Sequence, residues 1–292
     1  MVESTVRAEL REATIRLLAA GVDSAQLDAE ALLEYVLGVE RVYLIAHPER
    51  RMDESEIAEY HRLVARRERR EPLPHITGKR EFWSLEFEVT PAVLIPRPET
   101  EILVEQAVKK LTGRRAVIAD MGAGSGAIAV ALAKELPDAR IFATELSPEA
   151  MEVATANLVK HKMAERIVLL QGDLLEPLKG AEVEGLDAVV SNPPYIPSAE
   201  IDGLQVEVAC YEPRQALDGG PDGLRFHRRI LFDSRRFLKN GGYVVLEIGA
   251  DQGPAVLNIA RELGYSDATI TKDLAGLDRV LSAVWVEEDG DT

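Results

Sequence analysis

A regular alternation of strand-like and helix-like segments begins near residue 116 and continues toward the end of the chain. The strand-like apolar segments are residues 116–120, 140–145, 167–172, 186–192 and 243–249. The helix-length segments between them lie near residues 126–136, 148–161, 222–239 and 251–263. Such alternation predicts a mainly parallel, doubly wound α/β sheet with helices on both faces.

The last two apolar segments, 265–271 and 280–286, have no helix-length connection between them. We therefore expect them to pair as an antiparallel hairpin. Added to the five earlier strands, this hairpin gives a seven-stranded sheet, which we assign to a domain spanning residues 98–292. Before it, Pro72 and Pro74 interrupt the helical pattern, and aromatic and charged residues alternate from Glu81 to Thr90. Residues 74–97 are thus predicted to be a linker that contains a two-stranded β-ribbon.

Residues 1–73 are predicted to form a small helical domain. Ser24 is placed to cap a second helix that ends before Gly38, and Asp53 with Glu56 matches a capping box for a third. The basic run at residues 66–70 is interpreted as a solvated helix end. Because this domain has no cluster of nucleophile and base, its expected role is docking of a substrate or partner.

A glycine-rich loop follows the first strand of the sheet and opens a helix. It consists of Asp120, Met121, Gly122, Ala123, Gly124, Ser125 and Gly126. Glycine lets a ligand approach the backbone closely, and the helix N-terminus offers free amides to a carboxylate or phosphate. Glu145 ends the next strand, where it could accept hydrogen bonds from both ribose hydroxyls. The same pattern also fits a dinucleotide-binding fingerprint, so the loop alone does not choose the cofactor.

After the third strand, Asp173 is placed to hydrogen-bond an adenine amino group, with Leu174 lying against the ring. A helix cap is an equally good interpretation of Asp173.

Asn192-Pro193-Pro194-Tyr195 follows the apolar run 186–190, at the strand end where open α/β sheets bind ligands. An amide nitrogen is a poor nucleophile, because its lone pair is delocalised into the carbonyl. A site that methylates it must accept hydrogen bonds from both N–H groups, and the side-chain oxygen of Asn192 and the backbone oxygen of Pro193 could do so. The prolines restrict the backbone, and Tyr195 could stack on the flat amide. Although the motif also suits an ordinary turn, beside a cofactor loop it indicates methylation of a planar NH₂ group by S-adenosylmethionine.

Charge limits the choice of partner. The net charge is −16, whereas proteins that bind long nucleic acid normally present a basic face.

Cys210 is the single cysteine, which excludes an internal disulfide and a cysteine-rich zinc site and favours a reducing cytoplasm. No apolar run is long enough for a membrane span. We expect a cytoplasmic monomer that binds neither nucleic acid nor membrane.

At these residues the chain resembles the release factor glutamine methyltransferases. The resemblance also covers the helical N-terminal segment, Arg80-Glu81-Phe82-Trp83 and residues 95–101. It implies the class I methyltransferase fold, S-adenosylmethionine as cofactor and no metal. The implied substrate is the glutamine of the Gly-Gly-Gln loop in class I peptide chain release factors. By position, Gly122, Gly124, Gly126, Glu145 and Asn192 would contact the cofactor, and residues 192–195 would hold the glutamine. Leu174 departs from the tryptophan of some relatives.

Other functions share parts of this pattern. A ribosomal-protein glutamine methyltransferase would look similar through the sheet domain, but Pro98-Glu99-Thr100-Glu101 favours the release factor enzymes. A methyltransferase acting on adenine in DNA can use the same tetrapeptide, and the acidic charge argues against it. An NAD-dependent oxidoreductase would need an acid/base residue, for which no histidine has a suitable setting. A non-catalytic binding module would not need Asn192.

Overall fold

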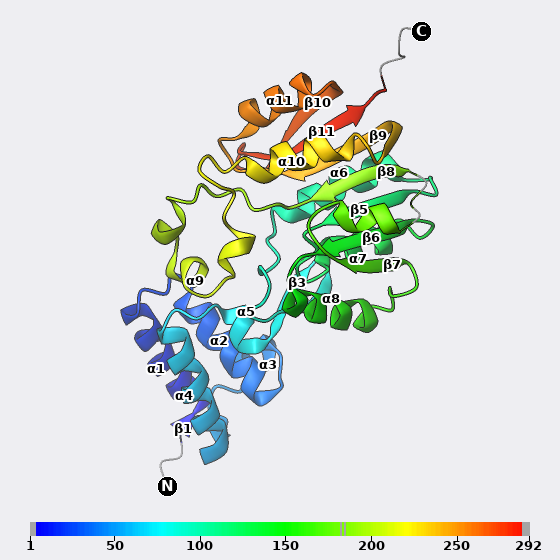
Figure 1. Cartoon of the computed structure of the whole chain (residues 1–292). Coiled ribbons are helices and arrows are strands. Elements are labelled where there is room, and N and C mark those ends of the chain that lie inside the picture. Colours follow the sequence, from blue (N-terminus) through cyan, green and yellow to red (C-terminus); the bar gives the residue numbers. More distant parts are fainter. Residues whose placement is uncertain (1–3, 182, 184, 288–292) are drawn as a thin grey trace, which may run out of the picture. The chain divides into compact units, whose positions relative to one another are not determined.

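The computed structural model describes residues 4–181, 183 and 185–287, so the outermost residues of the predicted terminal domains, 1–3 and 288–292, lie outside the described part. The chain forms two compact units. One, the helical unit, consists of the chain up to Lys79 together with Gln205–Tyr211. The other, the sheet unit, consists of Arg80–Leu204 and the chain from Glu212 onward. The first unit is therefore built from two separate stretches of sequence (Figure 1).

The helical unit is built from α-helices around an apolar core. Its helices are α1 Val6–Ala19, α2 Ala25–Leu37, α3 Arg41–Ala46, α4 Glu54–Glu68, α5 Leu73–Thr77 and α9 Val206–Ala209. Short strands β1 Ser4–Thr5 and β2 Arg51–Met52 pair antiparallel. The capping box of Asp53 and Glu56 is confirmed, and Gly38 ends α2 in the left-handed conformation. Ser24 is the N-cap residue of α2, as predicted, but its side chain accepts no hydrogen bond from the helix end, and its hydroxyl donates instead to the Asp28 carboxylate.

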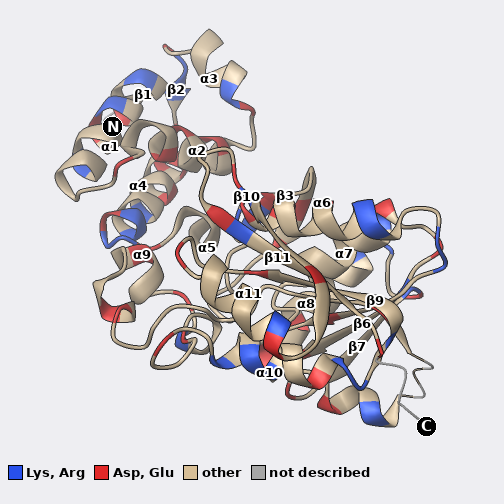
Figure 2. Ribbon diagram, turned by 90° about the horizontal axis from the view of Figure 1, so that it is seen from above, with Lys and Arg blue, Asp and Glu red and all other residues tan. Residues whose placement is uncertain are grey.

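The basic run at the end of α4 is not a simple solvated helix end. Arg67 is buried, and its guanidinium donates to Asp28 Oδ2 at 2.7 Å and to Glu207 Oε1 at 2.9 Å. Arg70 forms two further bonds to the Glu207 carboxylate, at 2.6 and 2.7 Å. Burial raises the pKa of Glu207, but the bonds from Arg70 and Arg67 outweigh it and lower the pKa overall. Figure 2 shows the basic residues of α4, with α9, which carries Glu207, beside them.

The sheet unit contains a seven-stranded sheet in the order β10-β11-β9-β8-β5-β6-β7. Its strands are β5 Val117–Met121, β6 Arg140–Glu145, β7 Ile167–Gln171, β8 Leu186–Ser191, β9 Leu238–Glu247, β10 Tyr265–Lys272 and β11 Asp278–Trp285. Strands β5 to β9 pair parallel, while β11 pairs antiparallel with both β9 and β10. The predicted seven-stranded sheet with an antiparallel C-terminal hairpin is confirmed.

Helices cover both faces of this sheet. They are α6 Thr100–Leu111, α7 Ala127–Glu135, α8 Pro148–Lys160, α10 Arg225–Ser234 and α11 Gly253–Glu262, with 3₁₀ turns η1 Glu176–Gly180, η2 Ile201–Gly203 and η3 Arg214–Ala216. The helix predicted over 222–239 is too long at both ends, since α10 spans only Arg225–Ser234. At the C-terminal end the chain already enters β9 at Leu238. Among the described residues, no helix is long and apolar enough to cross a membrane.

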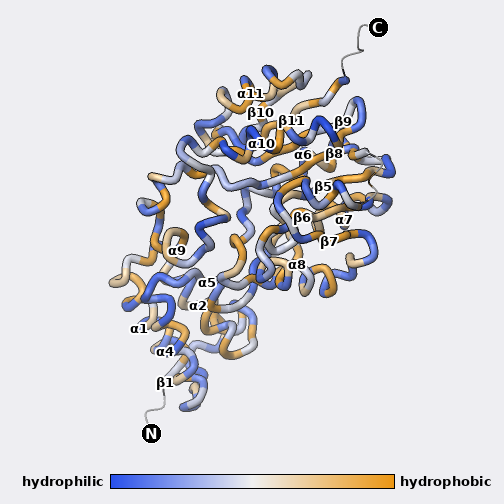
Figure 3. The backbone as a smooth tube through the Cα atoms, viewed as in Figure 1, coloured by the Kyte–Doolittle hydropathy of each residue, from blue (hydrophilic) through white to orange (hydrophobic). Residues whose placement is uncertain are grey.

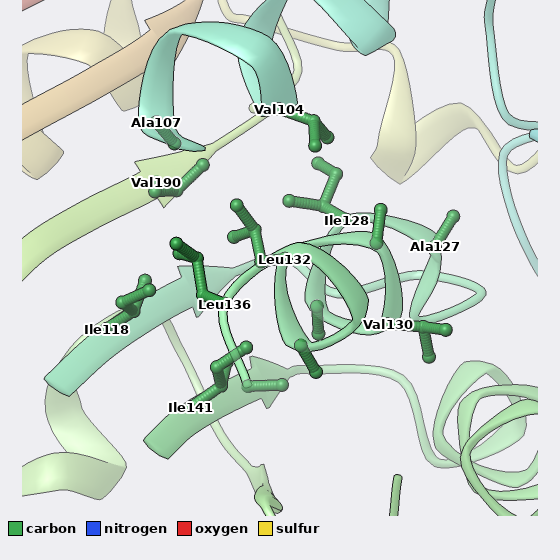
Figure 4. Packing of buried hydrophobic residues seen from close by; sticks show 14 of the residues in the cluster. Val104, Ala107, Ile118, Ala127, Ile128, Val130, Leu132, Leu136, Ile141 and Val190 are labelled. Atoms are coloured by element: carbon green, nitrogen blue, oxygen red, sulfur yellow. The ribbon is translucent and has the colours of Figure 1, made fainter. Parts of the chain in front are cut away.

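Successive residues of a strand point to opposite faces, and this creates two cores. Ile118 packs with α6 and α7 on one face, whereas its neighbour Ala119 packs with α10 and α11 on the other. Residues 127–133 of α7 are all buried, since the helix is covered on every side (Figure 4). The hydropathy colouring accordingly shows the central strands as largely apolar (Figure 3). These cores hold the carboxyl ends of the strands at one edge.

A two-stranded ribbon precedes the sheet, as predicted. Strands β3 Lys79–Phe82 and β4 Leu85–Glu88 pair through a two-residue turn in which Trp83 and Ser84 both have φ of 54°. The side chain of Asn157 in α8 bonds both the N–H and the C=O of Glu88 and also donates to the backbone oxygen of Ser125. One buried amide therefore ties the ribbon to the glycine loop.

Candidate active site

A cavity of about 440 Å³ opens at the carboxyl edge of the sheet, within the size range of small-molecule sites. Loops that follow β5, β6, β7 and β8 all contribute to its lining. The predicted site residues that line it are Gly122, Gly124, Glu145, Asp173, Leu174, Asn192, Pro193 and Pro194. The predicted residues that do not line it are Asp120, Ala123, Ser125, Gly126 and Tyr195. Segments from four strands therefore converge on one cavity.

The glycine loop needs glycine for two different reasons. Gly122 and Gly124 have φ of +71° and +54° and line the cavity, and no neighbouring atom lies within 4 Å of the position a Cβ would take. Gly126, at φ +79°, has a Cβ position 3.1 Å from Leu158 Cδ1 of α8. The first two glycines leave open space for a ligand beside the backbone, whereas the third lets two helices approach.

Glu145 is held rigidly at the end of β6. Its Oε2 accepts from the N–H of Gly124 at 2.8 Å, and its Oε1 accepts from Leu146 and Ser147 at 2.8 and 2.9 Å. Each carboxylate oxygen can accept more than one hydrogen bond, so these contacts leave capacity for a ligand hydroxyl. Glu145 thus both shapes the glycine loop and offers an acceptor in the cavity.

Behind the loop lie buried polar atoms without a described protein partner. Neither carboxylate oxygen of Asp120 nor the hydroxyl of Thr144 forms a hydrogen bond of ordinary geometry within the part of the chain that the structure describes. Burial raises the pKa of Asp120 to about 7, against a weaker opposing effect of the Ala129 amide. Thr144 lines the cavity, and buried polar groups are normally satisfied. The Thr144 hydroxyl therefore leaves hydrogen-bonding capacity at the cavity wall that suits a polar ligand, with Asp120 buried behind it.

Asp173 and Leu174 follow β7 and line the cavity together. The Asp173 carboxylate pairs with Arg229 of α10 at 2.7 Å and is partly exposed, so its side chain does not cap a helix. Leu174 has φ of +50° and packs against the core on the α10 side of the sheet. The carboxylate and the apolar side chain thus lie where a heterocyclic ring could contact both.

Asn192-Pro193-Pro194-Tyr195 leaves the sheet at the end of β8. The hydroxyl of Ser191 donates to Met121 O at 2.7 Å and fixes the strand end beside β5. The Tyr195 backbone oxygen accepts from Gln252 Nε2 at 2.9 Å. Gly223, at φ +72°, passes so close that a Cβ there would lie 2.4 Å from this oxygen. Both ends of the motif are consequently fixed before any ligand binds.

The side chains of the motif contact residues that the sequence analysis did not identify. The Asn192 amide donates from Nδ2 to Thr100 Oγ1 at 3.1 Å, and the Tyr195 hydroxyl donates to Glu247 Oε1 at 3.3 Å. The cavity wall also includes Ala92, Val93, Leu94, Pro213, Arg214, Gln215, Ala216, Asp218, Arg225 and Phe226. For Glu247 a signal existed, because it is the one acidic residue within the apolar segment 243–249. Thr100 belongs to the Pro98–Glu101 segment, but nothing in that segment indicated a contact with Asn192. The other residues belong to no motif, whether they lie in loops, in η3 or in α10.

His227 is buried and has a structural contact. Its Nε2 lies 2.8 Å from the backbone oxygen of Glu247, and burial lowers its pKa. No histidine lines the cavity as described, so a hydride-transfer acid or base of that type is absent from its wall.

Comparison with known proteins places the two parts of the sequence in recognised families. Residues 9–78 match the PrmC N-terminal domain, and residues 98–220 match the Methyltransferase small domain. A release factor glutamine methyltransferase of Moorella thermoacetica is 46% identical over 286 residues, which cover 97% of this chain and 100% of that protein. The corresponding protein of Geobacter sulfurreducens is 45% identical, with 89% and 90% covered.

Among solved structures, a methyltransferase from Pyrococcus furiosus superposes with a TM-score of 0.51. It is 22% identical, and the match covers 70% of this chain and 90% of that one. The similarity is one of fold.

Proposed function

The chain belongs to the release factor glutamine methyltransferase family, and we propose that it methylates the glutamine of the Gly-Gly-Gln loop in class I peptide chain release factors. It is a methyltransferase, and S-adenosylmethionine is its methyl donor. The observation that carries the choice of acceptor is the fixed position of Asn192 and Pro193 at the cavity wall. There, two oxygen acceptors can face one planar amide.

We assign the cofactor to the part of the cavity under the glycine loop. The open space beside Gly122 and Gly124 fits a bound amino-acid moiety, and Glu145 offers an acceptor for ribose hydroxyls. Asp173 and Leu174 are the proposed contacts of the adenine ring. When bound, the cofactor supplies a methyl group activated by the positive charge on sulfur.

In the proposed reaction the substrate amide nitrogen would gain the methyl group and lose one proton to solvent, and the cofactor would leave as the neutral thioether, with the electron pair of the broken carbon–sulfur bond on sulfur. Asn192 Oδ1 and Pro193 O accept the two N–H groups, which orients the nitrogen lone pair toward the methyl group. Because the prolines fix these oxygens in advance, little reorganisation is required during the reaction.

For Tyr195 the structure favours a role other than stacking on the substrate amide, which the sequence suggested. Its ring does not belong to the cavity wall, and its hydroxyl contacts Glu247. We therefore propose that Tyr195 supports the motif from behind, while the prolines form the wall against which the glutamine lies.

We propose that the helical unit helps to recognise the release factor. Its sequence matches a family domain of its own, and none of its residues belongs to the wall of the cavity as described. The proposal also includes a monomer that acts in the cytoplasm without nucleic acid, in keeping with a net charge of −16.

The direct test is incubation with labelled S-adenosylmethionine and, separately, a purified class I release factor, ribosomal protein or DNA. We expect label only on the release factor, with mass spectrometry locating the methyl group on the glutamine of Gly-Gly-Gln. A release factor with that glutamine replaced by alanine is the matched control. Asn192→Ala should reduce turnover at least about 100-fold while S-adenosylmethionine binding is partly retained. Label on DNA or ribosomal protein instead would contradict the proposal.

A further inference from the structure

Glu247, at the end of β9, is a buried acidic residue whose two carboxylate oxygens both face the motif region. The hydroxyl of Thr100 donates to Oε2 at 2.6 Å, and the hydroxyl of Tyr195 donates to Oε1 at 3.3 Å. Only 1% of the residue is exposed. The cavity wall does not include it, so it does not contact a ligand there. A buried carboxylate in this place calls for an explanation other than binding.

Sheet register explains how Glu247 reaches the motif. Strands β8 and β9 run parallel, with Ser191 opposite Leu246. The next residues, Asn192 and Glu247, therefore leave neighbouring strands at the same edge. Thr100 begins α6, and its hydroxyl contacts both side chains, with Asn192 Nδ2 donating to Oγ1 at 3.1 Å. A continuous path of hydrogen bonds joins the buried carboxylate to the motif asparagine.

The direction of these bonds follows from counting protons. When Glu247 is ionised, as it is above about pH 7, its carboxylate can only accept, and the Thr100 hydroxyl carries a single hydrogen. Because that hydrogen is donated to Glu247, Thr100 can only accept from Asn192. The Asn192 amide must therefore turn its Nδ2 toward Thr100, which leaves Oδ1 free on the other side. Turned the other way, the amide would oppose its own N–H groups to those of a substrate amide.

We propose that Glu247 and Thr100 are positioning residues that hold the Asn192 side chain with Oδ1 presented to the substrate amide. The inference rests on the proposed function, in which Asn192 accepts a hydrogen bond from glutamine. Glu247 also holds the Tyr195 hydroxyl, so one carboxylate fixes both ends of the motif. Thr100 and Glu247 touch neither substrate nor cofactor and act through Asn192 and Tyr195.

Thr100→Val and Thr100→Ser separate the hydroxyl from the shape of the side chain. Valine has nearly the same volume but can neither accept from Asn192 nor donate to Glu247, whereas serine can do both. At pH 8, where Glu247 is ionised, we expect Thr100→Val to lower kcat about 10- to 100-fold, as for loss of one buried hydrogen bond at the reacting group, with the Kd for S-adenosylmethionine within about twofold of wild type. Thr100→Ser should stay within about threefold in kcat. Ser282→Ala, which removes another buried hydroxyl from β11, is the matched control and should leave turnover unchanged.

A double-variant comparison tests whether the two residues act in one path. Glu247→Leu alone should lower turnover at least as much as Thr100→Val. Adding Thr100→Val to Glu247→Leu should cause no further loss of turnover, because without the carboxylate the Thr100 hydroxyl no longer fixes the orientation of Asn192. Independent, multiplying losses would overturn the proposal, and so would a Thr100→Val protein within twofold of wild type or a Thr100→Ser protein as slow as the valine variant.

A readout that does not depend on activity completes the test. The side-chain amide resonance of Asn192, assigned by its disappearance in Asn192→Asp, should shift in Thr100→Val and keep its wild-type position in Thr100→Ser. An unshifted resonance in Thr100→Val would overturn the inference even if the release factor is the substrate. Activity of the wild-type protein on the release factor tests the proposed function separately. If wild type is inactive but the Asn192 resonance still shifts in Thr100→Val, only the substrate assignment is contradicted.

Discussion

Replacing Glu247 by glutamine should make the protein increasingly more stable than wild type as the pH rises. Burial raises the pKa of the Glu247 carboxyl from its ordinary value of 4.5 to about 7. Hydrogen bonds from Thr100 and Tyr195 oppose this rise, as does the charge of Arg279, whereas the nearby charge of Glu99 adds to it. Glutamine keeps the size of the side chain and removes its titration.

The sign follows from proton linkage. Between about pH 4.5 and pH 7 the folded protein holds a proton on Glu247 that the unfolded chain has already lost, so this group makes the free energy of unfolding fall as the pH rises. At about 1.4 kcal/mol per pKa unit, the full effect is about 3 kcal/mol, complete above pH 7. Between pH 5 and pH 8 it amounts to about 2.5 kcal/mol. Asp120 titrates in the same direction, but it is present in both proteins and cancels from their difference.

The assay is urea-induced unfolding of wild type and Glu247→Gln at pH 5 and at pH 8, followed by tryptophan fluorescence. The only tryptophans, Trp83 and Trp285, both belong to the sheet unit, so the signal reports the part of the molecule that contains Glu247. The difference in unfolding free energy between the two proteins should grow by about 2.5 kcal/mol from the lower to the higher pH. A difference that stays constant within about 0.5 kcal/mol would refute the argument that burial perturbs this carboxyl.

Two further predictions concern the helical unit and the cofactor. Arg67→Ala should lower the unfolding free energy of the helical unit by about 3–5 kcal/mol, because it leaves the Asp28 carboxylate buried without its arginine partner. Hydrogen exchange of the α4 amides measures this loss of stability, and protection equal to wild type would contradict the role of the ion pair. Glu145→Ala should weaken S-adenosylmethionine binding about 10- to 100-fold, because it removes the proposed ribose acceptor and three hydrogen bonds that shape the loop. Calorimetry measures the Kd, and an unchanged Kd would rule out the contact between Glu145 and the ribose.

The sequence was sufficient for features that local pattern determines. The order of the strands in the chain, the hairpin and the capping box of Asp53 follow from periodicity and from residues a few positions apart, and all are present in the structure. The helix predicted over 222–239 failed at Leu238, because an apolar residue there fits a helix face and a strand equally well.

Features that depend on distant residues could not be predicted. The relay from Glu247 to Asn192 exists because two strands are neighbours in the sheet and α6 begins beside them, and no spacing in the sequence reports either fact. The pairing of Arg67 with Glu207 joins residues 140 positions apart. An arginine in a charged run is usually solvated, so only the folded structure distinguishes it from its neighbours.

The divided sequence of the helical unit has a consequence for how the protein is made. Arg67 and Arg70 leave the ribosome well before Glu207, which is translated 140 and 137 residues later. At roughly 5–20 residues per second, this delay is roughly 7–28 s. Strands β5 to β8 are synthesised in the interval, so the helical unit cannot be completed until most of the parallel strands of the sheet unit have been made. A shortened protein that ends after residue 79 would lack Glu207, the shared partner of Arg67 and Arg70, although Arg67 would keep its bond to Asp28. A fragment that begins after residue 79 would carry α9 without the other helices of its unit.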